Sequence, residues 1–285
     1  MNDDLPSLGG ETPLSTALTE GKQIGYEGFE LGKKFPRELQ ALKTLFAQYG
    51  LSLVSGWYSG RLAERSVEEE TEAVGPHLDL LAKNGATVMV YGEVANSIQG
   101  APQPLYQRPR FFSDAQWNRY CRASEPLRGI HALARHAREL SYHMGAYVDA
   151  CRRRSTDVAD QRSRRPAVRC GPHHLRGRRA LNVLQRHIAR VCHVYYKDVR
   201  PEIVKLAHNC NWSFLGAVIN GAFSVPCDGC VDYPGIIACL AEHGYSGWLV
   251  VEAEQDPVIA PSYEYADKGY RTLRALVDGT FKEAA

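Results

Sequence analysis

The sequence lacks several features that mark other classes of protein. It contains no run of eighteen apolar residues, so we expect no membrane-spanning helix. Its first residues, Met1 to Pro6, contain neither a basic nor an apolar segment, so we expect no secretory signal peptide. No Gly-x-Gly-x-x-Gly motif follows a predicted strand, which leaves a dinucleotide site without support. Without an export signal, the eight cysteines are expected to be free thiols of a cytoplasmic protein.

The composition is that of an ordinary globular protein. Apolar residues make up 44% of the 285 positions and charged residues 23%, which excludes wholesale disorder and collagen. This length suits one large domain, and an α/β barrel alone fills it. We therefore predict a single domain over residues 1–285.

The net charge of +2 conceals a strong local imbalance. Residues 152–179 hold ten arginines, no lysine and two acidic residues, a local charge of +8, while the remainder carries −6. We call residues 151–179 the arginine-rich segment. Such a segment could bind nucleic acid, but no aromatic residue is interleaved with the arginines, so nucleic acid is not the favoured partner.

Strand and helix patterns alternate along the rest of the chain. Strands are predicted at 28–32, 51–57, 87–91, 140–143, 191–196 and 247–252. Helices are predicted at 12–24, 36–49, 67–84, 180–190, 233–243 and 263–277, with a helix ending near Arg138 and helical stretches in an insertion at 200–225. Repeated strand–helix units predict a parallel sheet, and this many favour a closed (β/α)8 barrel over an open doubly wound sheet.

Polar side chains gather where the predicted strands end, and in a barrel these ends form the active-site rim. The candidates are Glu30, Trp57, Glu93, His143, His193, Lys197, Asp198, Glu252 and Glu254. Converging carboxylates and imidazoles are suited to a divalent metal. The alternative is that each is a solvated residue at a strand end.

The stretch Cys227-Asp228-Gly229-Cys230 has the spacing of a zinc or redox motif. No second cysteine pair lies at zinc-site spacing, and Asp-Gly favours a turn. We therefore predict a turn that carries two thiols.

Several stretches together resemble the myo-inosose-2 dehydratases, a family of xylose-isomerase-like TIM barrels. The matching stretches are Asn2-Asp3-Asp4-Leu5-Pro6, Gly28-Phe29-Glu30-Leu31-Gly32, Phe35-Pro36-Arg37, Ser55-Gly56-Trp57-Tyr58-Ser59, Ser97-Ile98-Gln99-Gly100, Tyr142-His143-Met144-Gly145, Lys197-Asp198-Val199-Arg200, Val225-Pro226-Cys227-Asp228-Gly229 and the block from Gly247 to Pro257, which is the most specific. They cover residues 1–149 and 180–275.

The resemblance implies a carbon–oxygen lyase of inositol catabolism in the bacterial cytosol. The reaction would remove water from 2-keto-myo-inositol (scyllo-inosose) and give a trihydroxycyclohexane-dione. A divalent metal, manganese or cobalt, would stabilise the enediolate as a Lewis acid. The implied partner is a small cyclitol, and the resemblance leaves open whether the chain forms a homo-oligomer.

The resemblance also assigns roles to individual residues. Glu252 and His143 would bind the metal. Lys197, Glu93 and His193 would be the acid–base groups, and Trp57, Arg200 and Glu254 would bind the substrate.

The sequence departs from the family pattern at three places outside the arginine-rich segment. The barrel's first strand should end before the Asn-Asp-Asp loop, so we expect it to be missing. The family has several histidines where His143 stands alone. The family's His-Val-His has a metal-binding second histidine, and Tyr195 occupies that position. Neutral tyrosine is a poor ligand for Mn²⁺.

The largest departure is the arginine-rich segment, which should contain a helix and a buried strand with a metal-binding aspartate. Read one base later, the codons of residues 166–177 permit Leu-Leu-Phe-Asp-Ala-Gly-His-Ile-Thr-Phe-Ala-Gly, in which the aspartate replaces Arg169. This is the missing strand, so we infer a frameshift, with a natural basic insertion as the alternative. As written, the segment is too poor in apolar residues for a buried strand, so we expect the strand near 164–172 to be disrupted.

These departures predict weak or absent metal-dependent activity for this chain. Two alternatives remain: a sugar isomerase or epimerase on the same barrel, and a non-catalytic remnant whose basic segment binds nucleic acid with a steep dependence on salt.

Overall fold

The computed structural model describes residues 5, 8–95, 97–104, 120, 122–123, 137–141, 167–169 and 180–283. The chain divides into two compact units, each with its own internal contacts. The first unit comprises residues 1–26, 99–107 and 166–285, and the second comprises 27–98 and 108–165. In the described ranges, no helix has both the length and the apolar character needed to cross a membrane. The assignment of all 285 residues to a single domain stays a prediction.

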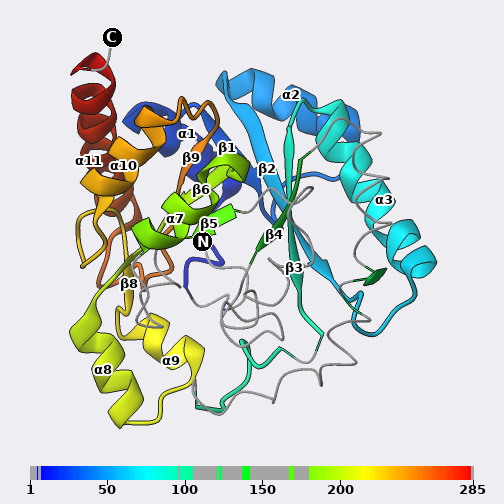
Figure 1. Cartoon of the computed structure of the whole chain (residues 1–285). Coiled ribbons are helices and arrows are strands. Elements are labelled where there is room, and N and C mark those ends of the chain that lie inside the picture. The colour runs from blue at the N-terminus through cyan, green and yellow to red at the C-terminus, as the bar shows by residue number, and fades with distance from the viewer. Residues whose placement is uncertain are drawn as a thin grey trace. The chain divides into compact units, whose positions relative to one another are not determined.

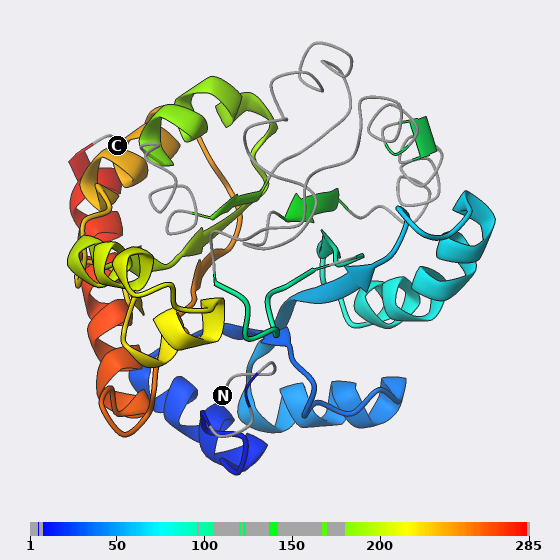
Figure 2. The same ribbon diagram turned by 90° about the horizontal axis from the view of Figure 1, so that it is seen from below.

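The second unit contains a four-stranded parallel sheet in the order β1-β2-β3-β4. The strands are β1 (Gly28–Leu31), β2 (Ser52–Gly60), β3 (Val88–Glu93) and β4 (Ala137–Ser141). Helix α2 (Leu39–Tyr49) connects β1 to β2, and α3 (Val67–Lys83) connects β2 to β3. Figures 1 and 2 show both helices covering one face of these strands. Every residue of β3 is buried, as the continuous apolar run from Val88 to Tyr91 predicts for the first four of them.

Local chemistry explains where the helices of the second unit begin and end. Helix α2 starts where the Glu38 carboxylate accepts hydrogen bonds from two backbone N–H groups, and it ends at Gly50, whose φ of 59° is left-handed. Helix α3 starts with a capping box between Ser66 and Glu69. The parallel register of β2 and β3, in which Gly60 is paired with Glu93, places the ends of the two strands at the same edge of the sheet.

The first unit contains a three-stranded parallel sheet, β5-β6-β9, and a two-stranded antiparallel pair, β7 and β8. Its strands are β5 (Ala167–Arg169), β6 (His193–Tyr196), β7 (Asp198–Val199), β8 (Phe223–Ser224) and β9 (Leu249–Val251). Its helices are α1 (Leu14–Ile24), α7 (Ala180–His187), the short 3₁₀ helix η1 (Ile188–Arg190), α8 (Pro201–Asn209), α9 (Phe214–Ile219), α10 (Tyr233–Glu242) and α11 (Ser262–Glu283).

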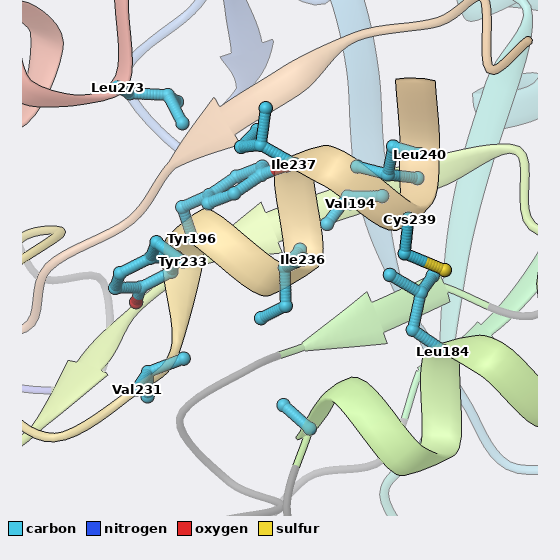
Figure 3. Close-up of a cluster of buried hydrophobic side chains, with 11 residues drawn as sticks. Leu184, Val194, Tyr196, Val231, Tyr233, Ile236, Ile237, Cys239, Leu240 and Leu273 are labelled. Atoms are coloured by element: carbon cyan, nitrogen blue, oxygen red, sulfur yellow. The ribbon is translucent and has the colours of Figure 1, made fainter. Parts of the chain in front are cut away.

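The core of the first unit lies between β6 and the helices that cover it. Val194 and Tyr196 of β6 pack with Leu184 of α7, Ile237 of α10 and Leu273 of α11 (Figure 3). Because side chains alternate along a strand, burial of residues 194 and 196 on this face directs residues 193, 195 and 197 to the opposite face. The core thus determines which side chains of this segment are available for chemistry.

Most predicted elements are confirmed with boundaries that differ by a few residues, and the 200–225 insertion contains α8 and α9. Residues 137 and 138 belong to β4, and the residues that would form the helix predicted to end near Arg138 lie outside the described range. One expectation is wrong. The arginine-rich segment does supply a strand, since β5 pairs with β6 from Ala167 to Arg169. A three-residue strand needs only backbone hydrogen bonds, which arginine provides as well as leucine does.

The expected absence of a first barrel strand concerns residues before α1. The described part of that stretch, residue 5 and residues 8–13, contains no strand. Residues 1–4, 6 and 7 lie outside the described range.

Candidate active site

The Lys197 ammonium group is the centre of the polar cluster in the first unit. Its Nζ lies 2.7 Å from Oε1 of Glu252 and 2.7 Å from Oε2 of Glu254, and its side chain is only 2% exposed. The ammonium also lies 4.8 Å from the centroid of the Phe223 ring, a favourable cation–π geometry. Two carboxylates thus compensate an ammonium group that is almost entirely removed from water.

The register of the sheet brings this cluster together. Tyr196 of β6 is paired with Val251 of β9, and the Glu252 N–H donates a hydrogen bond to the Tyr196 carbonyl oxygen at 3.0 Å. The residues that follow the two strands, Lys197 and Glu252, are therefore neighbours. Both come after the carboxyl ends of parallel strands, as the strand pattern predicted.

His193 and Tyr195 lie on the same face of β6 as Lys197. Both are fully buried, and their rings meet edge to face with 4.9 Å between centroids. In the adjacent strand β5, Ala167 is paired with His193 and Arg169 with Tyr195. Tyr195 therefore adds a buried phenol where the resemblance calls for a metal-binding imidazole.

Arg200, the predicted substrate-binding residue, contacts other protein groups. Its guanidinium donates to the Gly221 carbonyl oxygen at 3.0 Å, to the Ser224 hydroxyl and to the Asp228 carboxylate. The Lys268 ammonium also donates to Asp228. Burial alone would raise the pKa of the Asp228 carboxyl, but the hydrogen bonds from Lys268, Ser224 and Arg200 outweigh it and lower that pKa. This network joins α8 to the loop after β8.

Asp198 organises the turn that contains the two predicted thiols. Its Oδ1 accepts hydrogen bonds from the Val199 N–H at 2.8 Å and from the Val231 N–H at 3.0 Å. Cys227 and Cys230 are free thiols in a turn, as predicted. Burial and the nearby Asp198 carboxyl raise the pKa of both thiols, which disfavours the reactive thiolate.

Glu93 is the buried carboxyl group at the end of β3 in the second unit. Its two oxygens accept the Ala63 N–H at 3.2 Å and the Ala95 N–H at 3.0 Å. Burial raises the pKa of Glu93 to about 7, although both backbone hydrogen bonds oppose the rise. A carboxyl with this pKa can take up and release a proton at neutral pH.

Trp57 lies on β2 in the same unit and is half-buried. Its indole N–H donates to the Ser59 hydroxyl at 2.9 Å, and its ring packs on Gly92, where a Cβ would lie only 2.2 Å from the ring. The absence of a side chain at Gly92 therefore permits the indole ring to approach the backbone of β3 closely. Glu30 of β1 accepts a hydrogen bond from the Ser55 hydroxyl at 2.7 Å.

The predicted site residues that the structure describes are divided between the two units. Lys197, Glu252, Glu254, His193 and Arg200 belong to the first unit, and Glu93 and Trp57 to the second. Lys197, Glu252 and Glu254 are in contact. His143 lies outside the described residues, so its assignment as a metal ligand stays a prediction.

Comparison with known proteins places the chain among relatives that span almost its whole length. It is 42% identical over 282 residues to the rhizopine catabolism protein MocC of Rhizobium meliloti, covering 96% of this chain and 85% of that protein. It is 36% identical over 276 residues to the inosose dehydratase of Geobacillus thermodenitrificans, covering 96% of this chain and 93% of that enzyme.

This chain belongs to the inosose dehydratase family. Relatives at this identity support an enzyme of the hydro-lyase class and confirm the resemblance found in the sequence. No protein-family model matches the chain.

Solved structures show the fold of this family member. A xylose isomerase domain protein from Planctomyces limnophilus superposes with a TM-score of 0.65 at 14% identity and covers 91% of each chain. The fold is therefore the predicted xylose-isomerase-like TIM barrel.

The residues present do not match the metal centre that the resemblance implies. Among the described residues, no three His, Cys, Asp or Glu side chains lie close enough together to hold a metal ion. The Glu252 carboxylate is paired with Lys197, and Tyr195 and Arg169 stand at the two positions where the resemblance expects ligands. An arginine cannot bind a cation, because its guanidinium is always protonated.

Proposed function

We propose that this protein is an inosose hydro-lyase that removes water from 2-keto-myo-inositol and gives a trihydroxycyclohexane-dione. The observation that carries the proposal is the buried ion-pair cluster of Lys197, Glu252 and Glu254 in a chain of the inosose dehydratase family. These groups follow two adjacent parallel strands, which is where barrel enzymes hold their catalytic groups.

The reaction requires no redox step. The C–H bond next to the ketone breaks, its electron pair forms a carbon–carbon double bond, and the C–O bond of the β-hydroxyl breaks as water leaves. The resulting enol then takes its keto form. The protein must supply a base for the carbon-bound proton, a cation or hydrogen-bond donor for the ketone oxygen, and an acid for the departing hydroxyl.

Lys197 is suited to the second and third of these tasks. Its ammonium has three N–H donors, and the two carboxylates accept two of them at 2.7 Å, so one donor can face a substrate oxygen. Burial strengthens this interaction, because water does not compete for the charge. Glu254 would then orient Lys197 and accept a hydroxyl proton of the cyclitol.

The resemblance implies an acid–base role for Glu93, and its buried carboxyl group is suited to proton transfer. Its pKa of about 7 leaves a substantial fraction ionised at neutral pH, and it is basic enough to accept a proton in the transition state. The role of Trp57 as a wall against the cyclitol ring and that of His193 as an acid–base group are those implied by the resemblance.

We propose that this chain holds a divalent ion weakly and turns substrate over slowly. In the family a manganese or cobalt ion would act as the Lewis acid on the ketone. Here Arg169 and Tyr195 replace two of the ligands that the resemblance implies, and a cation site needs a nearly complete set of oxygen and nitrogen ligands.

The test is an assay of dione formation from 2-keto-myo-inositol by the purified full chain, with and without added Mn²⁺ or Co²⁺. We expect slow turnover that is lost in Lys197→Met and Glu254→Gln and kept in Lys83→Met, an exposed lysine. Isomerisation or epimerisation of the substrate without loss of water would overturn the dehydratase assignment. Turnover as fast as that of the Geobacillus relative would overturn the prediction of weak activity.

The proposal places the reaction in inositol catabolism in the cytoplasm, with a small cyclitol as the partner. The alternative in which the arginine-rich segment binds nucleic acid predicts DNA affinity that falls steeply as salt rises. The same preparation can test it, by titration with duplex DNA at two salt concentrations.

A further inference from the structure

A second buried carboxylate lies near Glu93 in the second unit. Glu70, on the first turn of α3, is fully buried, although glutamate is one of the residues least often found inside proteins. Its carboxylate accepts the Tyr91 O–H at 2.8 Å, the Arg61 backbone N–H at 3.1 Å and an N–H of the Arg65 guanidinium at 3.1 Å. The cost of burying this charge is offset by three donors, one of which is a cation.

Tyr91 connects this carboxylate to the loop that follows β2. While donating to Glu70, its hydroxyl also accepts the Leu62 N–H at 3.3 Å. The tyrosine ring packs on Gly60, where a Cβ would lie 1.9 Å from a ring atom, so no larger residue fits. Two consecutive N–H groups, those of Arg61 and Leu62, are thus held by Glu70 and Tyr91.

The next N–H along the chain is that of Ala63, and it donates to Glu93. The loop at residues 61–65 therefore lies between two buried carboxylates and is hydrogen-bonded to both. Glu70 and Glu64 add negative charge that raises the pKa of Glu93 beyond the effect of burial. The nearby cations, Arg61 and Arg65, are paired with Glu64 and Glu70 respectively.

We propose that Glu70 and Tyr91 are positioning residues for Glu93. Together they hold the 61–65 loop so that the Ala63 N–H meets the Glu93 carboxylate, and Glu70 keeps a fixed negative charge near it. This inference rests on the proposed function only for the role of Glu93 in proton transfer. The geometry itself is independent of the substrate.

Two substitutions separate the hydrogen bonds from the charge. Glu70→Gln keeps an oxygen that can accept from Tyr91 and Arg61 but removes the negative charge, so the pKa of Glu93 should fall. Tyr91→Phe keeps the charge but removes the hydroxyl that holds Leu62, so the Ala63 hydrogen bond should weaken and the pKa of Glu93 should rise. We expect shifts of about one pH unit or less in opposite directions.

The measurement is a pH titration of glutamate side-chain carboxyl groups by ¹³C NMR on the substrate-free full chain, with the Glu93 signal identified by its absence in Glu93→Gln. Glu72→Gln, the same substitution at an exposed position on α3, is the matched control and should leave the titration unchanged. Circular dichroism verifies folding. If the core variants do not fold, Arg65→Gln on the surface tests the same network and should raise the pKa of Glu93, because Glu70 loses its compensating cation.

Unchanged titration in folded Glu70→Gln and Tyr91→Phe, or a shift of both in one direction, would overturn the proposal. Its failure is distinct from failure of the proposed function. If the titration shifts as expected but the wild-type chain forms no dione, the positioning inference stands and the dehydratase activity does not. If dione forms, the apparent pKa that Glu93 contributes to the pH profile of kcat/KM should shift in each variant in the same direction as in the NMR titration.

Discussion

Arg169 of β5 is paired with Tyr195 of β6 in the parallel register of the first unit. The family resemblance implies a metal ligand at each of these two positions, an aspartate at the first and a histidine at the second. Because their backbones are neighbours, the two replacements affect one location. The strand β5 also coincides with the stretch that a one-base shift of reading frame converts into the family's Leu-Phe-Asp.

Restoring both ligand types should restore metal binding. We expect the double variant Arg169→Asp/Tyr195→His to bind Mn²⁺ at least about tenfold more tightly than the chain as written, because even outer-shell changes alter metal affinity by 10–100-fold. Electron paramagnetic resonance of free Mn²⁺ during titration measures this without an activity assay. Arg186→Asp, which makes the same charge change at an exposed residue of α7, is the control. Equal affinity of the double variant and the original chain would contradict the expectation.

The Lys197 cluster should contribute to stability as well as to catalysis. In Lys197→Met the carboxylates of Glu252 and Glu254 lose their shared cation. We expect the free energy of unfolding to fall by about 2 kcal/mol. This is less than the value for fully buried pairs, because both carboxylates are partly exposed. Urea unfolding at pH 7 measures it. Lys83→Met, which breaks an exposed pair with Asp79, should change stability by less than about 1 kcal/mol. Equal effects of the two variants would refute the buried-cluster interpretation.

Glu93 should make the protein less stable as pH rises. Its pKa is about 7 in the folded protein, raised by burial and by the Glu70 and Glu64 carboxylates, against 4.5 as its ordinary value. Between these pH values the folded state binds more protons than the unfolded state, so stability falls as pH rises through this window. Glu93→Gln should remove this loss, so its stability relative to the original chain should be about 3 kcal/mol greater at pH 8 than at pH 4.

Thermal unfolding of Glu93→Gln across this pH range provides the measurement. Glu68→Gln on α3 is exposed and should follow the original chain. If Glu93→Gln and the original chain lose stability in parallel, the carboxyl of Glu93 does not have the raised pKa.

Cys227 adopts a backbone conformation that favours glycine. Its φ is 63°, a left-handed value that costs a residue with a Cβ about 1–2 kcal/mol. Cys227→Gly should therefore raise the melting temperature by a few degrees, whereas Cys210→Gly, at φ −92°, should not. A lower melting temperature for Cys227→Gly would show that the thiol makes a compensating contact.

The frameshift inference predicts a result at the level of the gene. Resequencing across codons 135–185 should reveal a missing or additional base before codon 166 and a second, compensating change after codon 177, because residues 180–275 match the family in the frame as written. The corrected chain should then contain an aspartate in place of Arg169. If the DNA agrees with the chain as written, the inference is wrong and the arginine-rich segment is a genuine part of the protein.

Much of this architecture could be predicted from local patterns. Helix and strand periodicities, and glycines such as Gly50 and Gly85 after helices, depend on residues a few positions apart, so the linear order of elements was accessible. The block from Gly247 to Pro257 identified the family before any contact was known. The alternation along residues 193–197 also predicts which of these side chains share a face.

Other features depend on contacts between distant parts of the chain, and only the tertiary structure decided them. Lys197 and Glu254 are 57 positions apart, and nothing local specifies their ion pair. Glu70 stands in an acidic first turn that predicts a solvated helix end, although it shares the buried face of Val74 and Leu78, four and eight residues on. The strand at Ala167–Arg169 forms because β6 offers backbone partners, in a segment whose side chains predict none. Sequence patterns report local conformation, whereas burial and pairing are properties of the packed molecule.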